Sequence, residues 1–518
     1  MQGLYDTTTL LNSSCFSILH SDFSHDNTSF NTSYNSTSDP NFDTMFDVRQ
    51  PAKRFTSKKP QKPPTLTGMN RLPSLGPTAQ ERFLAAIAVH NTTHSSPATP
   101  ASPSVSSPLL LQQPGQIPGT RVHSTLLGSA LAVELKDDIV EASDPFIERL
   151  FPTERLPFSI DRCTLTVLAN AGYWDRKGNC FKGMSYTEEG MAEWLNNVGN
   201  TMAGMGHGVL RNSRQWWHGT CNLPPSGDAD FKRKPDLVLL DKEMHQHVKQ
   251  ISLQSDAPQR INWLHIRSFA EVTQQKSYPS RFPGTINAKS YLQFILQFDR
   301  RFVPALSING SGSYSLTLTD REGQIRYSGG SLVNKGLEPA RIFLKILAFL
   351  MFGNDSDIGL DPNFVRDLKS DTLTAVNVDG VHYELVRRIY ILESLLGRGT
   401  KVWVVKHDGV EYVLKDSWIQ ADRVESEASH LRLMLGHDTI KSKVPTFIGG
   451  GDVMIDGVTD STSIYRGSGL LGRLGNQRIH RRIVTTPIGE PLTSFQSKKE
   501  FIMAMITVIL GMSCNQSL

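Results

Sequence analysis

The stretch LLGRGTKVWVVKHDGVEYVLK, which runs from Leu395 to Lys415, indicates a fold more directly than any other part of the sequence. Gly397, Gly399 and Thr400 form a glycine-rich turn before a valine-rich run, and Asp408-Gly409 marks a second turn. β-Branched residues on both sides of an Asp-Gly pair are typical of a β-hairpin. We therefore expect two antiparallel strands that follow a glycine loop.

A glycine loop followed by a lysine on the next strand is suited to binding phosphate. Glycine lets backbone N–H groups approach an anion closely because no Cβ is in the way. A lysine on the following strand, here Lys415, can reach the same phosphates as a point charge. Two strands around a turn, without phosphate binding, would also fit the bare motif.

The loop and the string Leu414-Lys415-Asp416-Ser417-Trp418 together resemble the fungal-type protein kinase family, whose glycine loop reads GRGT and whose lysine strand reads LKDSW. The resemblance implies ATP with Mg²⁺ as cofactor. The residues that it places at the nucleotide are Gly397, Gly399, Thr400, Val404 and Lys415. In this assignment Val404 contacts adenine and Lys415 holds the α- and β-phosphates.

A protein kinase also needs a glutamate that pairs with the lysine and holds it toward the phosphates. A helix predicted to begin near Ala421 contains two candidates, Glu425 and Glu427. We prefer Glu427 because Leu431 follows it one turn further along the helix. Exposed helix acids without a role are the alternative for both residues.

Length and composition limit the class of protein. The 518 residues suffice for two or three domains, and the formal net charge of +4 does not favour nucleic acid or an acidic membrane as a partner. Five widely spaced cysteines without a CxxC pair are typical of a reduced intracellular protein. The apolar runs are too short to span a bilayer. We expect a cytoplasmic or nuclear protein whose partner or substrate is an unknown protein.

Residues 1–120 are dominated by Ser, Thr, Asn, Pro and Asp and contain few apolar residues that could form a core. We expect this low-complexity tail to be disordered. Residues 53–62 include several basic side chains and no acid. They fit a nuclear import signal or a solvated basic linker, and the linker is the commoner case.

Two predicted strands bring a pair of acids together. The turn Pro235-Asp236 leads into the apolar run 237–241, and Glu271 lies on a second predicted strand, 268–273. This pattern resembles the core of PD-(D/E)xK nucleases, in which two carboxylates hold Mg²⁺ and a lysine lies near the attacking water. The resemblance implies a metal site at Asp236 and Glu271.

The lysine of that motif is missing. Thr273 occupies its position, and Lys276 lies three residues further on, which places it on the opposite face of a strand. We therefore expect a decayed or purely structural version of the nuclease fold. An active Mg²⁺-dependent nuclease is the alternative.

Other strings resemble, in order and spacing, the region that precedes the kinase in the same family: KPDLVLLD at 234–241, RFVPAL at 301–306, TDREG at 319–323 and GLDP at 359–362. Periodicity predicts helices at 288–298 and 339–352 and strands at 301–308, 314–320 and 324–328. The turn 309–312 between two of these strands is interpreted as a hairpin rather than a phosphate loop.

The second half continues the kinase pattern only in part. A strand is expected at 444–448, a turn at Gly449-Gly450-Gly451, a strand with the hinge at 481–489, and a helix at 498–510. The polar segment before residue 481 is interpreted as an insertion. The expected fold is therefore α/β (α+β), with a disordered tail at 1–120, a nuclease-like α/β domain at 121–380 and a partial kinase small lobe at 381–518.

No HRD-type or DFG motif occurs in the sequence, and 103 residues follow Lys415. We expect a truncated kinase region with no catalytic residues, which either a truncated or misjoined gene model or a degenerate paralogue would produce. The family activity implied by the resemblance is ATP-dependent phosphorylation of Ser and Thr in proteins, lost in this chain. The alternative is a non-catalytic interaction protein, and a nuclease is the third hypothesis.

Overall fold

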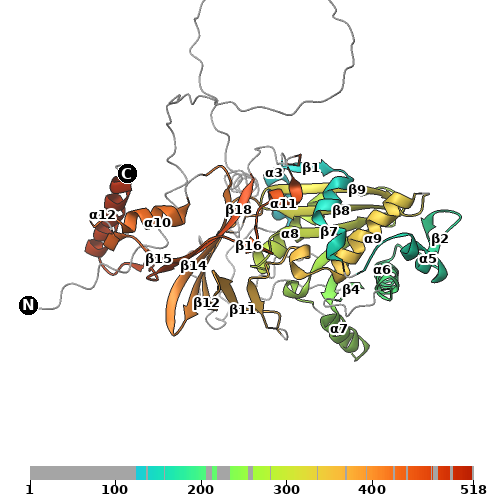
Figure 1. Cartoon of the computed structure of the whole chain (residues 1–518), viewed down its shortest axis with the longest axis horizontal. Helices are drawn as coiled ribbons and strands as arrows, with labels where there is room; N and C mark the ends of the chain where they lie inside the picture. The colour runs from blue at the N-terminus through green and yellow to red at the C-terminus, as the bar shows by residue number, and fades with distance from the viewer. Residues whose placement is uncertain are drawn as a thin grey trace, which may run out of the picture. The chain divides into compact units, whose positions relative to one another are not determined.

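The computed structural model describes residues 124–515 with internal gaps at 136–137, 157, 206–212, 219–233, 255–260, 281, 335, 368–369, 393, 424–425, 439–440, 468, 471–476 and 491–493. Predictions for the tail 1–120, including the basic segment 53–62, lie outside these residues. The described chain contains two large sheets with flanking helices (Figure 1). This confirms the expected mixed α/β class. Both sheets belong to one compact unit.

The first sheet has seven strands in the order β1-β9-β8-β7-β6-β5-β4. β6 and β7 are parallel, as are β1 and β9, and the other neighbours are antiparallel. The strand bounds are β1 (Ile139–Ala142), β4 (Arg214–His218), β5 (Leu237–Asp241), β6 (Ser268–Val272), β7 (Val303–Ile308), β8 (Ser313–Asp320) and β9 (Gly323–Ser331).

Helices cover both faces of the first sheet because its central strands are apolar on both sides. Leu237 and Leu239 of β5 pack into a core with α6 and α9, whereas Val238 and Leu240 pack into a second core with α3 and α8. The helices are α3 (Ser124–Glu134), α4 (Asp144–Leu150), α5 (Arg162–Asn170), α6 (Glu188–Ala203), α7 (Lys242–Gln254), α8 (Phe282–Leu296) and α9 (Leu337–Phe352), with 3-10 turns η1 (Thr153–Arg155), η2 (Trp263–His265) and η3 (Asp355–Ile358) and a small ribbon, β2 (Trp174–Asp175) and β3 (Cys180–Phe181).

The second sheet also has seven strands, in the order β10-β11-β12-β13-β14-β18-β15. All of its neighbouring strands are antiparallel. The strand bounds are β10 (Phe364–Arg366), β11 (Leu373–Val378), β12 (Val381–Ile391), β13 (Lys401–His407), β14 (Val410–Gln420), β15 (Thr446–Asp452) and β18 (Arg478–Thr486). The predicted domain boundary at residue 380 falls in the turn between β11 and β12, so this sheet has strands on both sides of it.

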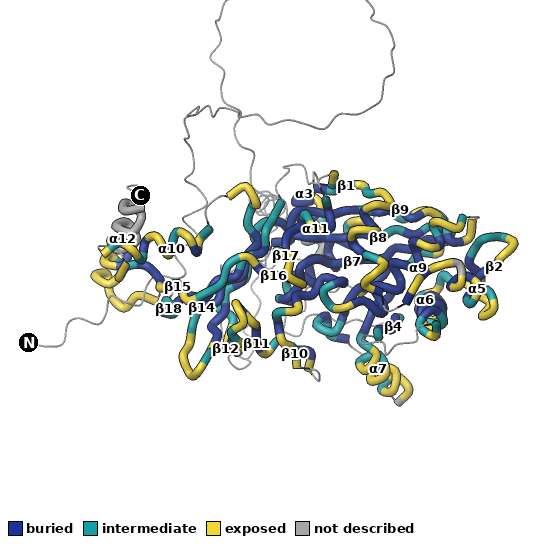
Figure 2. Tube along the Cα trace, in the orientation of Figure 1, coloured by how far each residue is buried: buried dark blue, intermediate teal, exposed yellow. Residues whose placement is uncertain are grey.

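The remaining elements accompany the second sheet in sequence: α10 (Glu427–Leu435), η4 (Lys441–Lys443), β16 (Met454–Ile455), β17 (Val458–Thr459), α11 (Ser463–Arg466) and α12 (Lys498–Asn515). β16, β17 and α11 lie in the segment that was interpreted as an insertion. Figure 2 shows the central strands of the first sheet as buried, whereas α7 and the described part of α12 are largely exposed. Ile502 and Ile506 of α12 are both exposed.

The hairpin predicted from the opening stretch is present. β13 pairs with β14 in an unbroken antiparallel register from Lys401 opposite Asp416 to His407 opposite Val410. Asp408 and Gly409 both have positive φ, 48° and 81°, which is the conformation that a two-residue I′ turn needs. The hairpin between β7 and β8 is also present, because these strands pair on either side of residues 309–312.

The turn predicted at Gly449-Gly450-Gly451 was wrong. These residues continue β15 and pair with β18 across a register shift between Phe447 and Gly449. Gly450 has φ +104°, and a Cβ at this position would lie 2.2 Å from the carbonyl oxygen of Arg482. The glycines therefore serve close backbone pairing at a bulge instead of chain reversal.

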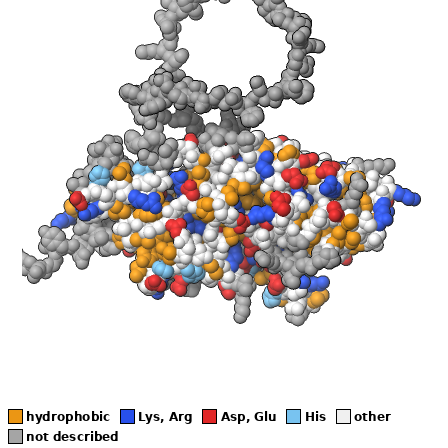
Figure 3. All heavy atoms as spheres, in the orientation of Figure 1, with side chains coloured by type: hydrophobic (Ala, Val, Ile, Leu, Met, Phe, Trp, Pro, Cys, Tyr) orange, Lys and Arg blue, Asp and Glu red, His pale blue; other side chains and the backbone are white. Residues whose placement is uncertain are grey.

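Two helix boundaries also differ from the prediction. The chain after Lys415 stays in β14 as far as Gln420, and α10 begins at Glu427 rather than near Ala421. α8 begins at Phe282, six residues before the predicted start, and ends at Leu296. In the described part of the chain, no helix combines the length and apolarity required to cross a membrane. Basic and acidic side chains are intermixed on the face drawn in Figure 3.

Candidate functional site

Lys415 lies on β14, an interior strand between β13 and β18, which positions it on one face of the second sheet. The register places Val402 opposite Lys415 and Val404 opposite Val413. Directly opposed side chains point to the same face, and residues two apart on a strand share a face, so these four side chains lie together. Lys415 is only 7% exposed and Val404 is fully buried.

Glu427 is the first residue of α10, where the Ser426 side chain accepts a hydrogen bond from the Ser429 N–H at 3.0 Å and caps the helix. The Lys415 Nζ lies 2.8 Å from Glu427 Oε1 and 2.6 Å from Oε2. The structure therefore brings the predicted lysine and glutamate together. Glu425, the other candidate, lies outside the described residues.

Packing of α10 holds Glu427 in this position. Ala428, Leu431 and Met434 on one side of the helix are buried against Val444 and against Ile483 of β18. Ile483 is the register partner of Lys415. The helix thus covers the same sheet face that presents the lysine, and the ion pair lies at its N-terminal end.

The glycine loop between β12 and β13 uses the conformational freedom of glycine at two positions. Gly397 and Gly399 have φ values of +87° and +49°, in the left-handed region. A Cβ at Gly397 would meet no atom within 4 Å, whereas a Cβ at Gly399 would lie 2.5 Å from Cζ of Arg321. Thr400 is buried at the end of the loop.

The opposite face of the same strands carries a buried network of charges. Arg482 Nη2 donates to Asp361 Oδ2 and to Asp416 Oδ2, both at 2.6 Å. His480 lies between two carboxylates, with Nε2 2.5 Å from Asp416 Oδ1 and Nδ1 2.9 Å from Asp460 Oδ2. Arg301, two residues before the start of β7, closes the network by a two-point contact with Asp460.

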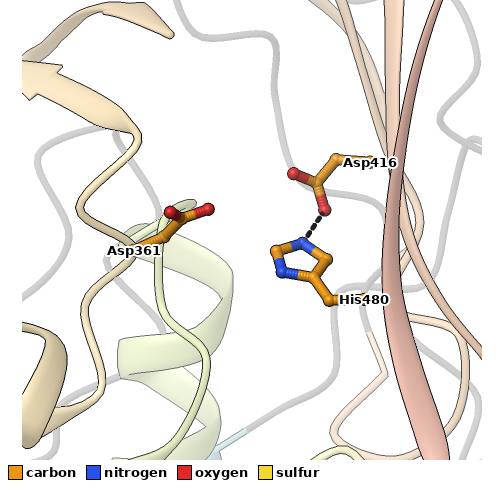
Figure 4. Close-up of side chains that lie close together, drawn as sticks. All are labelled: Asp361, Asp416 and His480. Atoms are coloured by element: carbon orange, nitrogen blue, oxygen red, sulfur yellow. Dashed lines mark hydrogen bonds and ion pairs between the residues drawn. The ribbon is translucent and has the colours of Figure 1, made fainter. Parts of the chain in front are cut away.

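Three members of this network, Asp361, Asp416 and His480, present ligand-type atoms close together (Figure 4). They do not fit a metal ion. Arg482 already donates to both aspartates, and both His480 nitrogens face carboxylates, so the histidine has no lone pair to offer. Three carboxylates against Arg301, Arg482 and a protonated His480 balance in charge. The network is therefore a set of ion pairs between the two sheet regions.

Asp236 and Glu271, the predicted metal ligands, are neighbours. Asp236 directly precedes β5, and its Oδ2 accepts the Val272 N–H of β6 at 2.8 Å. The Glu271 carboxylate pairs with the ammonium group of Lys289 from α8. Burial raises the pKa of Glu271 to about 7, although Lys289 opposes that shift.

The sequence did not indicate Lys289 as a partner of the acids Asp236 and Glu271. The motif required a lysine on the same strand as Glu271, and α8 supplies one from a different element. The predicted helix 288–298 contained Lys289, but helical periodicity alone does not show which sheet residue a buried lysine meets. Thr273 and Lys276, the positions considered from the sequence, are not needed for this contact.

A strand lysine that is paired with a glutamate on the following helix, behind a glycine loop, is the arrangement by which protein kinases hold the phosphates of ATP. The class that the second sheet defines is therefore protein-kinase-like. Residues 236–473 match the model of the family described as fungal protein kinase, so this part of the chain is similar to that family. No curated protein and no solved structure matches the chain.

Proposed function

We propose that the second sheet binds ATP with Mg²⁺. The observation that carries this proposal is the ion pair between Lys415 and Glu427, on the sheet face that also presents Val404. Lys415 would hold the phosphates, Glu427 would orient Lys415, and Val404 would meet the base. The magnesium ion, when bound with the nucleotide, would neutralise phosphate charge.

The family activity is ATP-dependent phosphorylation of serine and threonine in proteins, and we propose that this 518-residue chain does not complete it. The sequence contains neither an HRD nor a DFG triplet. The first triplet provides the aspartate that accepts the substrate proton, and the second provides a magnesium ligand. Lys415 and Glu427 can orient a phosphate chain, but they supply neither of these groups.

Nucleotide binding can be tested by thermal unfolding with and without Mg-ATP. At ten times the dissociation constant, ATP should stabilise the wild-type protein by about 1.4 kcal/mol and raise its melting temperature. Lys415→Ala should remove this shift, because the phosphates lose their cation. The matched control is Lys406→Ala, which removes an exposed lysine from the same hairpin.

An equal shift in the wild type and in Lys415→Ala would place the nucleotide elsewhere and overturn the proposed site. A wild-type protein that shows no shift at any ATP concentration would instead favour the alternative, a non-catalytic protein whose α/β region binds a protein partner.

A second candidate function, metal-dependent hydrolysis of phosphodiesters, is favoured by Lys289. With Asp236 and Glu271 this residue restores the two acids and one lysine of the nuclease pattern. Ser307 on β7 is the register partner of Glu271. The buried Oγ of Ser307 has no hydrogen-bond partner within the described structure, so a polar group remains available beside the two acids. The two carboxylates would hold a magnesium ion, which would supply an activated water.

Plasmid nicking in the presence of Mg²⁺ tests this candidate. Wild-type protein should nick supercoiled DNA, and Asp236→Asn should abolish nicking because one carboxylate ligand is lost. Lys276→Met serves as the control, since this lysine is exposed and follows Glu271 by five residues in the sequence. Absence of nicking by the wild type, or nicking that survives in Asp236→Asn, would remove the nuclease candidate.

A further inference from the structure

Arg321 holds the glycine loop at several points. It lies in the turn between β8 and β9 of the first sheet and is only 2% exposed. Its Nη1 donates to the carbonyl oxygens of Ser394 at 2.7 Å and Leu395 at 3.1 Å, and its own carbonyl oxygen accepts the Gly397 N–H at 2.9 Å. One residue of the first sheet region thus fixes the chain as it enters the loop.

The loop is also shaped to receive this side chain. The guanidinium group of Arg321 lies where a Cβ of Gly399 would be, since an added Cβ would come within 2.6 Å of Nε. Glycine at 399 therefore allows the loop backbone to lie directly against the arginine. Leu395 and Leu396 are buried in the core on the α8 side of the first sheet, and the Leu396 N–H donates to Glu134 Oε1 at 2.9 Å.

Arg321 brings a positive charge that is not matched by a directly bonded acid. Its hydrogen bonds go to neutral carbonyl groups, its guanidinium stacks on the Phe294 ring at 4.4 Å, and its buried Nε has no partner in the described residues. Burial lowers its pKa to about 10, and Glu134 is the acid that opposes this shift most. The group remains a cation at neutral pH.

Two further arginines add to this charge. Arg398 lies within the loop between the two glycines, and Arg478 lies on β18; the Nε of each is buried without a partner in the described structure. Arg478 is near enough to lower the pKa of Arg321, and Arg398 is near enough to lower that of Arg478. The carboxylates of Glu322 and Asp320 raise the pKa of Arg478 and so stabilise its charge. Asp320, however, already forms an ion pair with Arg466.

We infer that Arg321 is a positioning residue for the nucleotide site: it orders the glycine loop from behind and makes the loop favour a phosphate chain over an uncharged nucleoside. The inference rests on the proposed nucleotide binding. Arg321, a residue of the first sheet region, would contribute to the affinity for ATP without touching the ligand. A fixed loop loses less conformational freedom on binding, and a buried cation attracts phosphate across low-dielectric protein.

The test compares Arg321→Met with Arg300→Met. Arg300 is an equally buried arginine whose hydrogen bonds also go to uncharged groups, the Ile266, Arg267 and Ile358 carbonyls and Gln297 Oε1, none of which belongs to the glycine loop. Arg321→Met should weaken ATP binding about tenfold and leave adenosine binding unchanged. Hydrogen exchange at the amides of Leu396 and Gly397 should also become about tenfold faster.

Arg321→Lys provides a second variant if the methionine variant does not fold. A lysine keeps the charge but lacks the planar guanidinium, so the preference for ATP over adenosine should persist while the amides lose protection. Unchanged ATP affinity in Arg321→Met, or an equal loss in Arg300→Met, overturns the inference while nucleotide binding stands. A wild-type protein that binds no ATP overturns the proposed function, and the inference with it.

Discussion

Replacing Arg482 by methionine is expected to lower the free energy of unfolding by about 3–5 kcal/mol, the range for removing one partner of a buried ion pair. Arg482 is 2% exposed and donates from Nη2 to both Asp361 and Asp416 at 2.6 Å. Its guanidinium also stacks on Phe364 at 4.7 Å. Without it, two buried carboxylates remain near each other with less compensating charge.

Denaturant unfolding at neutral pH measures this loss. The neighbouring variant Arg481→Met is the matched control, because Arg481 pairs with Asp452, whose side chain is 38% exposed. That pair should contribute about 1 kcal/mol or less. Adding Asp416→Asn to Arg482→Met should recover part of the stability, since one uncompensated charge disappears. A loss below about 1 kcal/mol in Arg482→Met would contradict the role assigned to this network.

The hairpin was predictable from sequence because its signals are local. An Asp-Gly turn between two runs rich in β-branched residues specifies both strands and their register, and the structure has that register from Lys401 to Val410. The choice of Glu427 over Glu425 also depended on short-range spacing, and the structure brings Glu427 to Lys415. Which face of the hairpin would carry the lysine follows from the alternation of side chains along a strand.

The ends of strands that pair with segments far away in the sequence could not be predicted from local signals. β14 extends to Gln420 because Gln420 pairs with Arg478, across a segment of more than fifty residues. The glycines at 449–451 have the composition of a turn, and only their pairing with β18 shows that they lie in a strand. Local propensity favours the wrong element when a partner strand from elsewhere supplies the hydrogen bonds.

Several sequence segments resemble the family although they contain no recognisable catalytic or binding motif, and the structure shows what their charged residues contact. Asp416 of LKDSW, Asp361 of GLDP and Arg301 of RFVPAL are members of the buried charge network. Asp320 and Arg321 of TDREG bind Arg466 and the glycine loop, respectively. These residues join the first sheet region to the second, a role that no single stretch of sequence reveals because each partner lies far away in the chain.

His480 should make the stability depend on pH. Burial alone would lower its pKa, but the carboxylates of Asp416 and Asp460 outweigh that effect and raise it to about 8. Protonated His480 therefore stabilises the folded state fully below its unfolded pKa of about 6.5, and this contribution disappears as the pH rises through about 8. A difference of about 1.5 pKa units corresponds to about 2 kcal/mol.

Two other buried groups also make the stability depend on pH: Lys401, which lies outside the network but interacts electrostatically with Asp416, and Asp460 within it. Burial lowers the pKa of Lys401 to about 7, so this lysine makes the stability rise with pH above that value. Interactions with Arg301 and His480 lower the pKa of Asp460 to about 2 despite its burial, so its contribution is lost only in acid. The wild-type profile alone would mix these effects, and a difference between variants separates them.

The informative measurement is the free energy of unfolding of the wild type minus that of His480→Gln, determined from pH 5.5 to 9. Glutamine can still donate a hydrogen bond to one aspartate but cannot carry the charge. The difference should be greatest at the acidic end and about 2 kcal/mol smaller at pH 9. His407→Gln, on the β13–β14 hairpin outside the network, tests whether loss of any histidine has this effect. A difference for His480→Gln that is constant across the range would mean that His480 is neutral between its two carboxylates, and the charge balance inferred for the network would then be wrong.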